Sequence, residues 1–130
     1  MFSVFRKLFV LVLATVAATA FAMSVTGQAY TQADFDSLQK AGKPTLVMVH
    51  ADWCPVCHAQ DPLLLDLLQT PELKDITALS VDFDKQKDVL RNFRVSKQST
   101  LIVFKGGKEV ARSTGDTNKE SLAALLKKAL

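Results

Sequence analysis

Residues 45–58 read TLVMVHADWCPVCH, and this stretch decides the fold. Its first six residues are an apolar run that predicts a buried strand, because a central parallel strand is apolar on both faces. Cys54 and Cys57, the only two cysteines of the 130-residue chain, follow where a helix is predicted to begin. Helix N–H groups and the helix dipole stabilise a thiolate at that position. The spacing therefore predicts a reversible redox pair.

The short spacer argues against a purely structural disulfide. Structural bridges in exported proteins normally close longer loops, because the entropic gain grows with loop length. A bridge between Cys54 and Cys57 would close almost no loop. Reactivity explains the pair better than stabilisation does.

The first 22 residues have the pattern of a cleaved secretory signal. Arg6 and Lys7 precede an uncharged apolar run of roughly 15 residues, which is shorter than the ~20 needed to cross a bilayer as a helix. Ala20-Phe21-Ala22 then matches a signal-peptidase site. We therefore expect one domain over residues 23–130, located in the periplasm or an equivalent space. A retained N-terminal segment that anchors the protein in a membrane is the alternative.

The charge of the chain does not indicate a nucleic-acid partner. The formal net charge is +3, and loss of Arg6 and Lys7 with the signal would leave 14 basic against 13 acidic residues. No basic run interleaved with aromatic residues occurs in the sequence. The remaining ~108 residues suffice for one modest core. We expect a monomer.

Hydrophobic periodicity and turn residues predict alternating helices and strands. The expected elements are a short strand ending at residues 29–30, a helix over 31–40, a strand over 45–50, a helix over 54–69 with a kink at Pro62, a strand over 76–83, a helix over 85–93, a hairpin of strands 100–105 and 109–113, and a last helix capped by Thr117. The order β-α-β-α-β-α-β-β-α predicts an α/β domain with a mixed central sheet and helices on both faces.

This order, with Trp-Cys-x-x-Cys at the exit of the second strand, closely resembles the thioredoxin family. The likeness covers essentially all of residues 30–130. Further matching features are Ala51 and Asp52 before Trp53, Pro62 five residues after the second cysteine, Asp84 at the end of the third strand, the hairpin FKGG at 104–107, and Gly115 before the last helix. The resemblance implies a thioredoxin fold.

The resemblance also implies roles for the redox pair and its neighbours. Cys54 would be the exposed nucleophile that attacks a substrate disulfide, and Cys57 the buried thiol that resolves the mixed disulfide. Trp53 would flank the sulfur on the substrate-facing surface, although a tryptophan is also a common core residue. The dipeptide Pro55-Val56 is uncharged and differs from the Gly-Pro of ordinary thioredoxins.

Two departures from the family pattern stand out. Met48 occupies the position, six residues before the first cysteine, where thioredoxins usually carry a buried aspartate. Ser99 occupies the site of the usual cis-proline. Because a cis bond to a residue other than proline costs roughly 3–4 kcal/mol, we expect the Gln98–Ser99 bond to be trans. Ser99 then either donates a hydrogen bond to the Cys54 thiolate or opens the site to another ligand, or it marks only the loss of a constraint.

The two histidines lie next to the redox pair in sequence. His50 ends the buried strand and His58 follows Cys57 directly. In thioredoxins the buried aspartate is thought to help deprotonate the resolving thiol, and Met48 cannot accept a proton. Either imidazole would lower a thiol pKa if charged, or take over this role as a base if neutral. The plainer interpretations are that His58 is an exposed helix residue and that His50 fills space where thioredoxins keep an aromatic side chain.

Two further classes of site remain open at this point. The sequence Cys54-Pro55-Val56-Cys57-His58 matches the attachment motif of c-type haem, although such cytochromes are mostly helical. The thiolates with His58 or His50 also offer three ligands to a metal or cluster, whereas a structural zinc site needs four.

We expect an exported thiol–disulfide oxidoreductase that acts on protein substrates without a bound cofactor. The uninterrupted fold favours a reductant, because neither the helical insertion of strongly oxidising relatives nor a dimerisation extension is present. After export, reducing equivalents would have to come from a membrane thiol electron-transfer donor.

Overall fold

The computed structural model describes residues 27–130, and the predicted signal at 1–22 lies outside them. Within the described range, no helix combines the length and apolar character needed to span a bilayer. The elements are β1 (Gln28–Ala29), α1 (Gln32–Lys40), β2 (Thr45–His50), α2 (Pro55–Leu68), β3 (Thr77–Asp82), α3 (Lys87–Phe93), β4 (Thr100–Lys105), β5 (Lys108–Thr114) and α4 (Lys119–Lys127). This is the predicted order.

The five strands form one mixed sheet in the order β1-β3-β2-β4-β5. β1, β3 and β2 run parallel, whereas β4 is antiparallel to both β2 and β5. Val47 of β2 lies between Leu79 and Ile102 in the two flanking strands, and all three side chains are fully buried. β2 is therefore the centre of the sheet, as its apolar sequence predicts.

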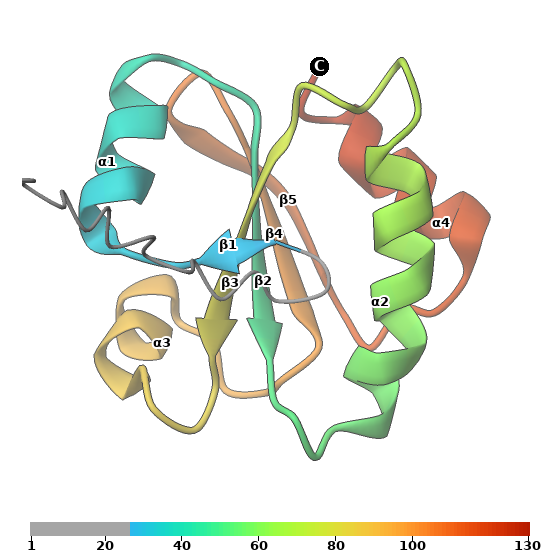
Figure 1. The fold of residues 1–130 in the computed structure, drawn as a ribbon. Coiled ribbons are helices and arrows are strands. Elements are labelled where there is room, and N and C mark those ends of the chain that lie inside the picture. The colour runs from blue at the N-terminus through green and yellow to red at the C-terminus, as the bar shows by residue number, and fades with distance from the viewer. Residues whose placement is uncertain (1–26) are drawn as a thin grey trace, which may run out of the picture.

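Helices cover both faces of this sheet, as Figure 1 shows: α1 and α3 lie on one side, α2 and α4 on the other. Side chains of a strand alternate between faces, so β2 feeds two cores. Leu46 and Met48 pack toward α2 and α4, and Val47 and Val49 pack toward α1 and α3. Since Met48 is part of the first core, the position of the family's buried acid is here filled by packed apolar volume.

The local sequence explains where helix α2 begins. Cys54 is its N-cap and Pro55 its first residue, where proline's fixed φ suits the helix and its missing N–H is not needed. Pro62 lies inside the helix without ending it. The buried face of α2 comprises Cys57, Gln60, Leu64 and Leu67.

Some predicted boundaries were wrong. The third strand ends at Asp82, and Asp84 lies in the turn after it. The last helix is capped by Asn118 and not by Thr117, because the Asn118 side chain accepts a hydrogen bond from the Ser121 N–H at 2.8 Å. Asparagine is among the strongest N-capping residues. The predicted Thr31 cap of α1 is confirmed, with the Asp34 N–H as its donor.

Candidate active site

The loop between β2 and α2 places the two thiols at the start of a helix. Sγ of Cys54 accepts a hydrogen bond from the N–H of Cys57 at 3.2 Å, so the first sulfur is itself the capping atom of α2. Both thiols are free in the structure. The predicted position of a nucleophilic sulfur at a helix N-terminus is thus present.

Ser99 brings a hydroxyl to both sulfurs. Its Oγ lies 3.1 Å from Sγ of Cys54 and 3.3 Å from Sγ of Cys57. No peptide bond within residues 27–130 is cis, so the expected trans Gln98–Ser99 bond is confirmed. Ser99 instead has a left-handed backbone with φ of 61°, and its N–H donates to the carbonyl of Val49 at 2.8 Å. This conformation, which is costly for a residue other than glycine, holds the hydroxyl at the sulfur pair.

The implied exposure of Cys54 is not observed. Cys54 is 0% exposed and Cys57 is 1% exposed. Both pack with Ala51, against Phe83, and Ser99 lies against them from the loop before β4. Access of a protein substrate to the Cys54 sulfur therefore requires a local movement of the residues packed around it.

The environment separates the acidities of the two thiols. Burial works against ionisation of Cys54, but hydrogen bonds from the Cys57 thiol, the Ser99 hydroxyl and the N–H groups of Cys57 and Val56 outweigh it and lower the pKa of Cys54 below its ordinary 9.0. Burial, together with the proton that the Cys57 thiol donates to Cys54, raises the pKa of Cys57. Cys54 is consequently the thiol that ionises first.

Trp53 forms the outer surface next to the pair. Its side chain is 57% exposed, which excludes the alternative that it is a core residue. Its indole Nε1–H donates to the carboxylate of Asp84 at 2.8 Å, and its ring packs edge-on to Phe83. Val56 is also exposed. These side chains give the site an apolar rim.

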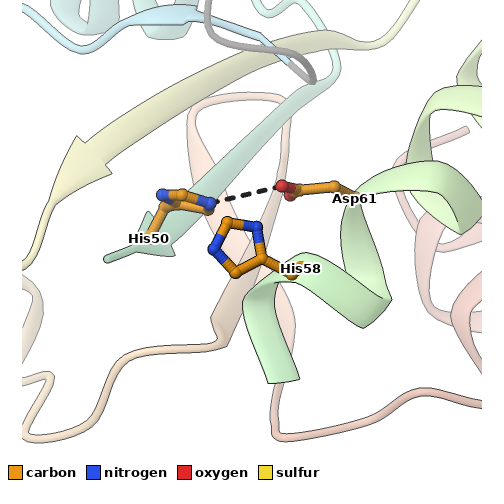
Figure 2. Close-up of side chains that lie close together, drawn as sticks. All are labelled: His50, His58 and Asp61. Atoms are coloured by element: carbon orange, nitrogen blue, oxygen red, sulfur yellow. Dashed lines mark hydrogen bonds and ion pairs between the residues drawn. The ribbon is translucent and has the colours of Figure 1, made fainter. Parts of the chain in front are cut away.

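The histidines interact with acids and with each other. Nε2 of His50 lies 3.3 Å from Oδ2 of Asp61, and Nε2 of His58 hydrogen-bonds to the backbone carbonyl of Asp52. The two rings are edge-to-face at 5.7 Å. Figure 2 shows both rings and the Asp61 carboxylate gathered between the end of β2 and the first turns of α2. Nε2 of each histidine therefore contacts an oxygen atom and not a sulfur. This favours an indirect influence on the thiols over direct proton transfer from a cysteine.

Sequence reasoning missed Asp61 and Gln60. Asp61 was detectable, because it lies three residues after His58 and therefore on the same helix face. Gln60 is buried on α2, and its Nε2 donates to the carbonyls of Ser99 at 3.3 Å and Asp116 at 2.8 Å. No sequence pattern signals this contact, since Ser99 is 39 and Asp116 56 positions away.

The two rival sites fit the geometry poorly. The c-type cytochromes are mostly helical, whereas this chain forms a five-stranded mixed sheet with the cysteines at the exit of its central strand. Within residues 27–130, the cluster of three possible metal ligands is His50, His58 and Asp61, and it contains neither cysteine. A metal held by the thiolates is therefore not favoured.

A sulfur of lowered pKa at a helix N-terminus, a second thiol one turn away, and a mixed sheet with helices on both faces define a thiol–disulfide oxidoreductase. The family model described as Thioredoxin matches residues 26–128. The chain belongs to the thioredoxin family.

Individual relatives agree with this assignment. The thioredoxin of Chlamydia trachomatis is 41% identical over 83 residues, which cover 64% of this chain and 79% of the relative. The thioredoxin of Staphylococcus aureus is 40% identical over 101 residues, covering 77% and 94%. The crystal structure of Trxlp from Edwardsiella tarda EIB202 superposes with a TM-score of 0.74 at 46% identity, covering 75% of this chain and 95% of that one.

Proposed function

We propose that the protein is an exported protein-disulfide reductase in which Cys54 attacks and Cys57 resolves. The observation that carries these roles is that Sγ of Cys54 accepts the Cys57 N–H at the start of α2 and lies 3.1 Å from the Ser99 hydroxyl. These contacts lower the pKa of Cys54, whereas burial raises that of Cys57. A thiolate is the attacking species in thiol–disulfide exchange. The thiol that ionises first is therefore the nucleophile.

The exchange takes place in two balanced steps. The Cys54 thiolate attacks one sulfur of a substrate disulfide, forms a mixed disulfide and releases the other substrate sulfur as a thiolate that takes up a proton. Cys57 then loses its proton and attacks Sγ of Cys54, which breaks the mixed disulfide and releases the second substrate thiol. Two electrons reach the substrate, and the protein is left with a Cys54–Cys57 disulfide.

Ser99 supports both steps from one position. In the reduced protein its hydroxyl donates to the Cys54 thiolate. In the mixed disulfide Cys54 carries no charge, and the same hydroxyl is close enough to donate to Cys57 as that thiol ionises. A hydroxyl with pKa far above that of a thiol does not act as the base, so the proton from Cys57 passes to water or to the leaving substrate thiolate. The hydrogen bond compensates in part for the acid that Met48 replaces.

Export and direction of electron flow form the rest of the proposal. Residues 1–22 support export, and the element order without a helical insertion supports reduction over oxidation. A reductase in the periplasm needs a membrane thiol electron-transfer donor to regenerate Cys54 and Cys57. The exposed Trp53 and Val56 suit transient contact with protein substrates, for which a monomer suffices.

Two measurements test the proposal. The reduction potential of the Cys54–Cys57 pair should be about −270 mV, as in thioredoxin-like reductants, whereas a value of about −120 mV would indicate an oxidant. In cells that express the chain, the protein should appear in the periplasmic fraction and begin after Ala22. Recovery of the intact chain from the membrane fraction would instead support the anchored form.

A further inference from the structure

We propose that His50, His58 and Asp61 form a binding site for a divalent metal ion of the zinc type, distinct from the thiol pair. One ring nitrogen of each histidine and one carboxylate oxygen of Asp61 all lie within 4.8 Å of one another. The residues come from two elements: His50 ends β2, whereas His58 and Asp61 are three residues apart on α2 (Figure 2). The inference does not depend on the proposed thiol exchange.

The spacing of the donor atoms is close to that of a tetrahedral site. Zinc bonds of ~2.0–2.1 Å at tetrahedral angles place neighbouring donor atoms about 3.3 Å apart. Nε2 of His50 and Oδ2 of Asp61 already lie 3.3 Å apart. The third donor comes from the exposed His58, one ring nitrogen of which lies within 4.8 Å of the other two donor atoms. Small side-chain adjustments therefore complete the site without a change in the backbone.

Asp52 lies beside both imidazoles, outside the cluster of donor atoms. The Nε2–H of His58 donates to the Asp52 carbonyl, which leaves the Nδ1 lone pair for a metal. In the metal-free protein Nε2–H of His50 donates to Asp61, and Nδ1 lies 3.9 Å from the Asp52 carboxylate. An ion that takes the place of the Nε2 proton would leave the remaining ring proton on Nδ1, the nitrogen on the Asp52 side. Histidine ligands of metals usually donate their other N–H to a carbonyl or a carboxylate. His58 has such a partner, and the Asp52 carboxylate lies near the corresponding nitrogen of His50.

The donor set selects the class of ion. Two imidazoles and one carboxylate suit zinc and neighbouring transition metals better than calcium or magnesium, which prefer oxygen ligands. Three protein ligands leave a fourth position for water. The side chains of His50 and Asp61 are only 21% and 13% exposed, whereas His58 lies at the surface and provides the entry route.

Metal binding here would affect the loop that carries the redox pair. The ligands flank residues 51–57 in the sequence, so an ion would cross-link the end of β2 to the first two turns of α2. An ion that binds only the folded state stabilises it in proportion to the logarithm of its concentration. Because no ligand is a thiolate, binding should persist whether Cys54 and Cys57 are reduced, oxidised or removed.

The test is a calorimetric titration of Zn²⁺ into the purified protein carrying Cys54→Ser and Cys57→Ser. We expect one ion per chain in this background. Added His58→Ala or Asp61→Asn should each weaken binding at least ~10-fold, since loss of an outer-shell partner alone costs about 10–100-fold. Asp66→Asn is the matched control, because Asp66 is an exposed acid on the same helix paired with Lys119. It should leave the affinity unchanged.

Two outcomes of the titration would overturn the proposal. Loss of binding in the double cysteine variant would show that the thiolates hold the ion, and equal affinity in the His58→Ala and Asp61→Asn variants would show adventitious binding at the surface. Thermal unfolding without metal confirms that the variants fold. Co²⁺ provides an independent readout, because thiolate ligation produces a charge-transfer absorption that the imidazole–carboxylate site should lack.

Discussion

The hydroxyl oxygen of Ser99 lies 3.1 Å from Sγ of Cys54, although 45 positions separate the two residues in sequence. The same oxygen lies 3.3 Å from Sγ of Cys57. A hydroxyl has one hydrogen to donate, so it favours one thiolate at a time. Ser99 therefore takes part in deciding which sulfur carries the charge at each stage of the exchange.

Replacement of Ser99 by alanine should raise the pKa of Cys54 toward its ordinary 9.0, because one of the hydrogen bonds that stabilise the thiolate is lost. The alkylation rate of the first cysteine should then reach half its maximum at a higher pH than in the wild type. Stopped-flow alkylation, with mass spectrometry to identify the modified thiol, measures this. Ser96→Ala, at an exposed position of the same loop, is the control. An unchanged pH profile would rule out the role of the hydroxyl.

The left-handed backbone at Ser99 predicts a difference between two substitutions that both remove the hydroxyl. Ser99→Gly should be about 1 kcal/mol more stable than Ser99→Ala, because glycine adopts a positive φ without the steric cost that Cβ imposes. Urea unfolding of the reduced proteins gives the two free energies. Equal stabilities, or a more stable alanine variant, would show that this backbone is not strained in solution.

The two cysteines should behave differently when replaced. Cys54→Ser should abolish reduction of insulin, since no nucleophile then reaches the substrate disulfide. In the Cys57→Ser variant, Cys54 should still attack the substrate disulfide, but the mixed disulfide should accumulate because the resolving thiol is missing. Non-reducing electrophoresis with mass spectrometry detects the adduct. If Cys54→Ser accumulated the adduct and Cys57→Ser did not, the two roles would be reversed.

The Trp53–Asp84 hydrogen bond should matter for substrates more than for stability. Asp84→Ala removes the acceptor that orients the exposed indole. We expect slower insulin reduction, with a change in the free energy of unfolding of no more than ~0.5 kcal/mol, as is usual for surface substitutions. Asp75→Ala, an exposed acid before β3, is the control for loss of charge. A rate equal to that of the control would show that the orientation of Trp53 is unimportant.

Two adjacent leucines on α2 should differ strongly in their contribution to stability. Leu64 is 1% exposed and belongs to the core under α2 and α4, whereas Leu65 is 38% exposed. Leu64→Ala should cost about 2–5 kcal/mol, because it removes buried methyl groups and leaves a cavity. Leu65→Ala should cost much less. Chemical denaturation of both variants measures the difference, and similar losses would contradict the assigned face of the helix.

The order of elements and the central strand could be predicted from sequence because they depend on local patterns. The apolar run at 45–50 and the glycine turn at 106–107 each have a single plausible structure. Boundaries were less predictable, since Asn118 and Thr117 are both good capping residues and only the final path of the chain decides between them.

Part of the site could also be predicted, because it too depends on local sequence patterns. The thiols and their helix position follow from the local sequence Trp53–Cys57, and the trans bond at Ser99 follows from the energetics of peptide bonds. The burial of Cys54 did not follow, because it depends on how the loop before β4 folds back onto the helix. The contacts of Asp61 and Gln60 likewise arise only when distant segments meet.

The hydrogen bonds of Gln60 limit where the sequence of this domain can change. Its side-chain nitrogen donates to carbonyls in the loop before β4 and in the loop before α4. Glutamate at this position would offer no hydrogen to either carbonyl, and leucine would leave both without a donor in the interior. Lengthening either loop would move a carbonyl that this amide must reach. Insertions should therefore be tolerated elsewhere on the surface before they are tolerated in these two connections.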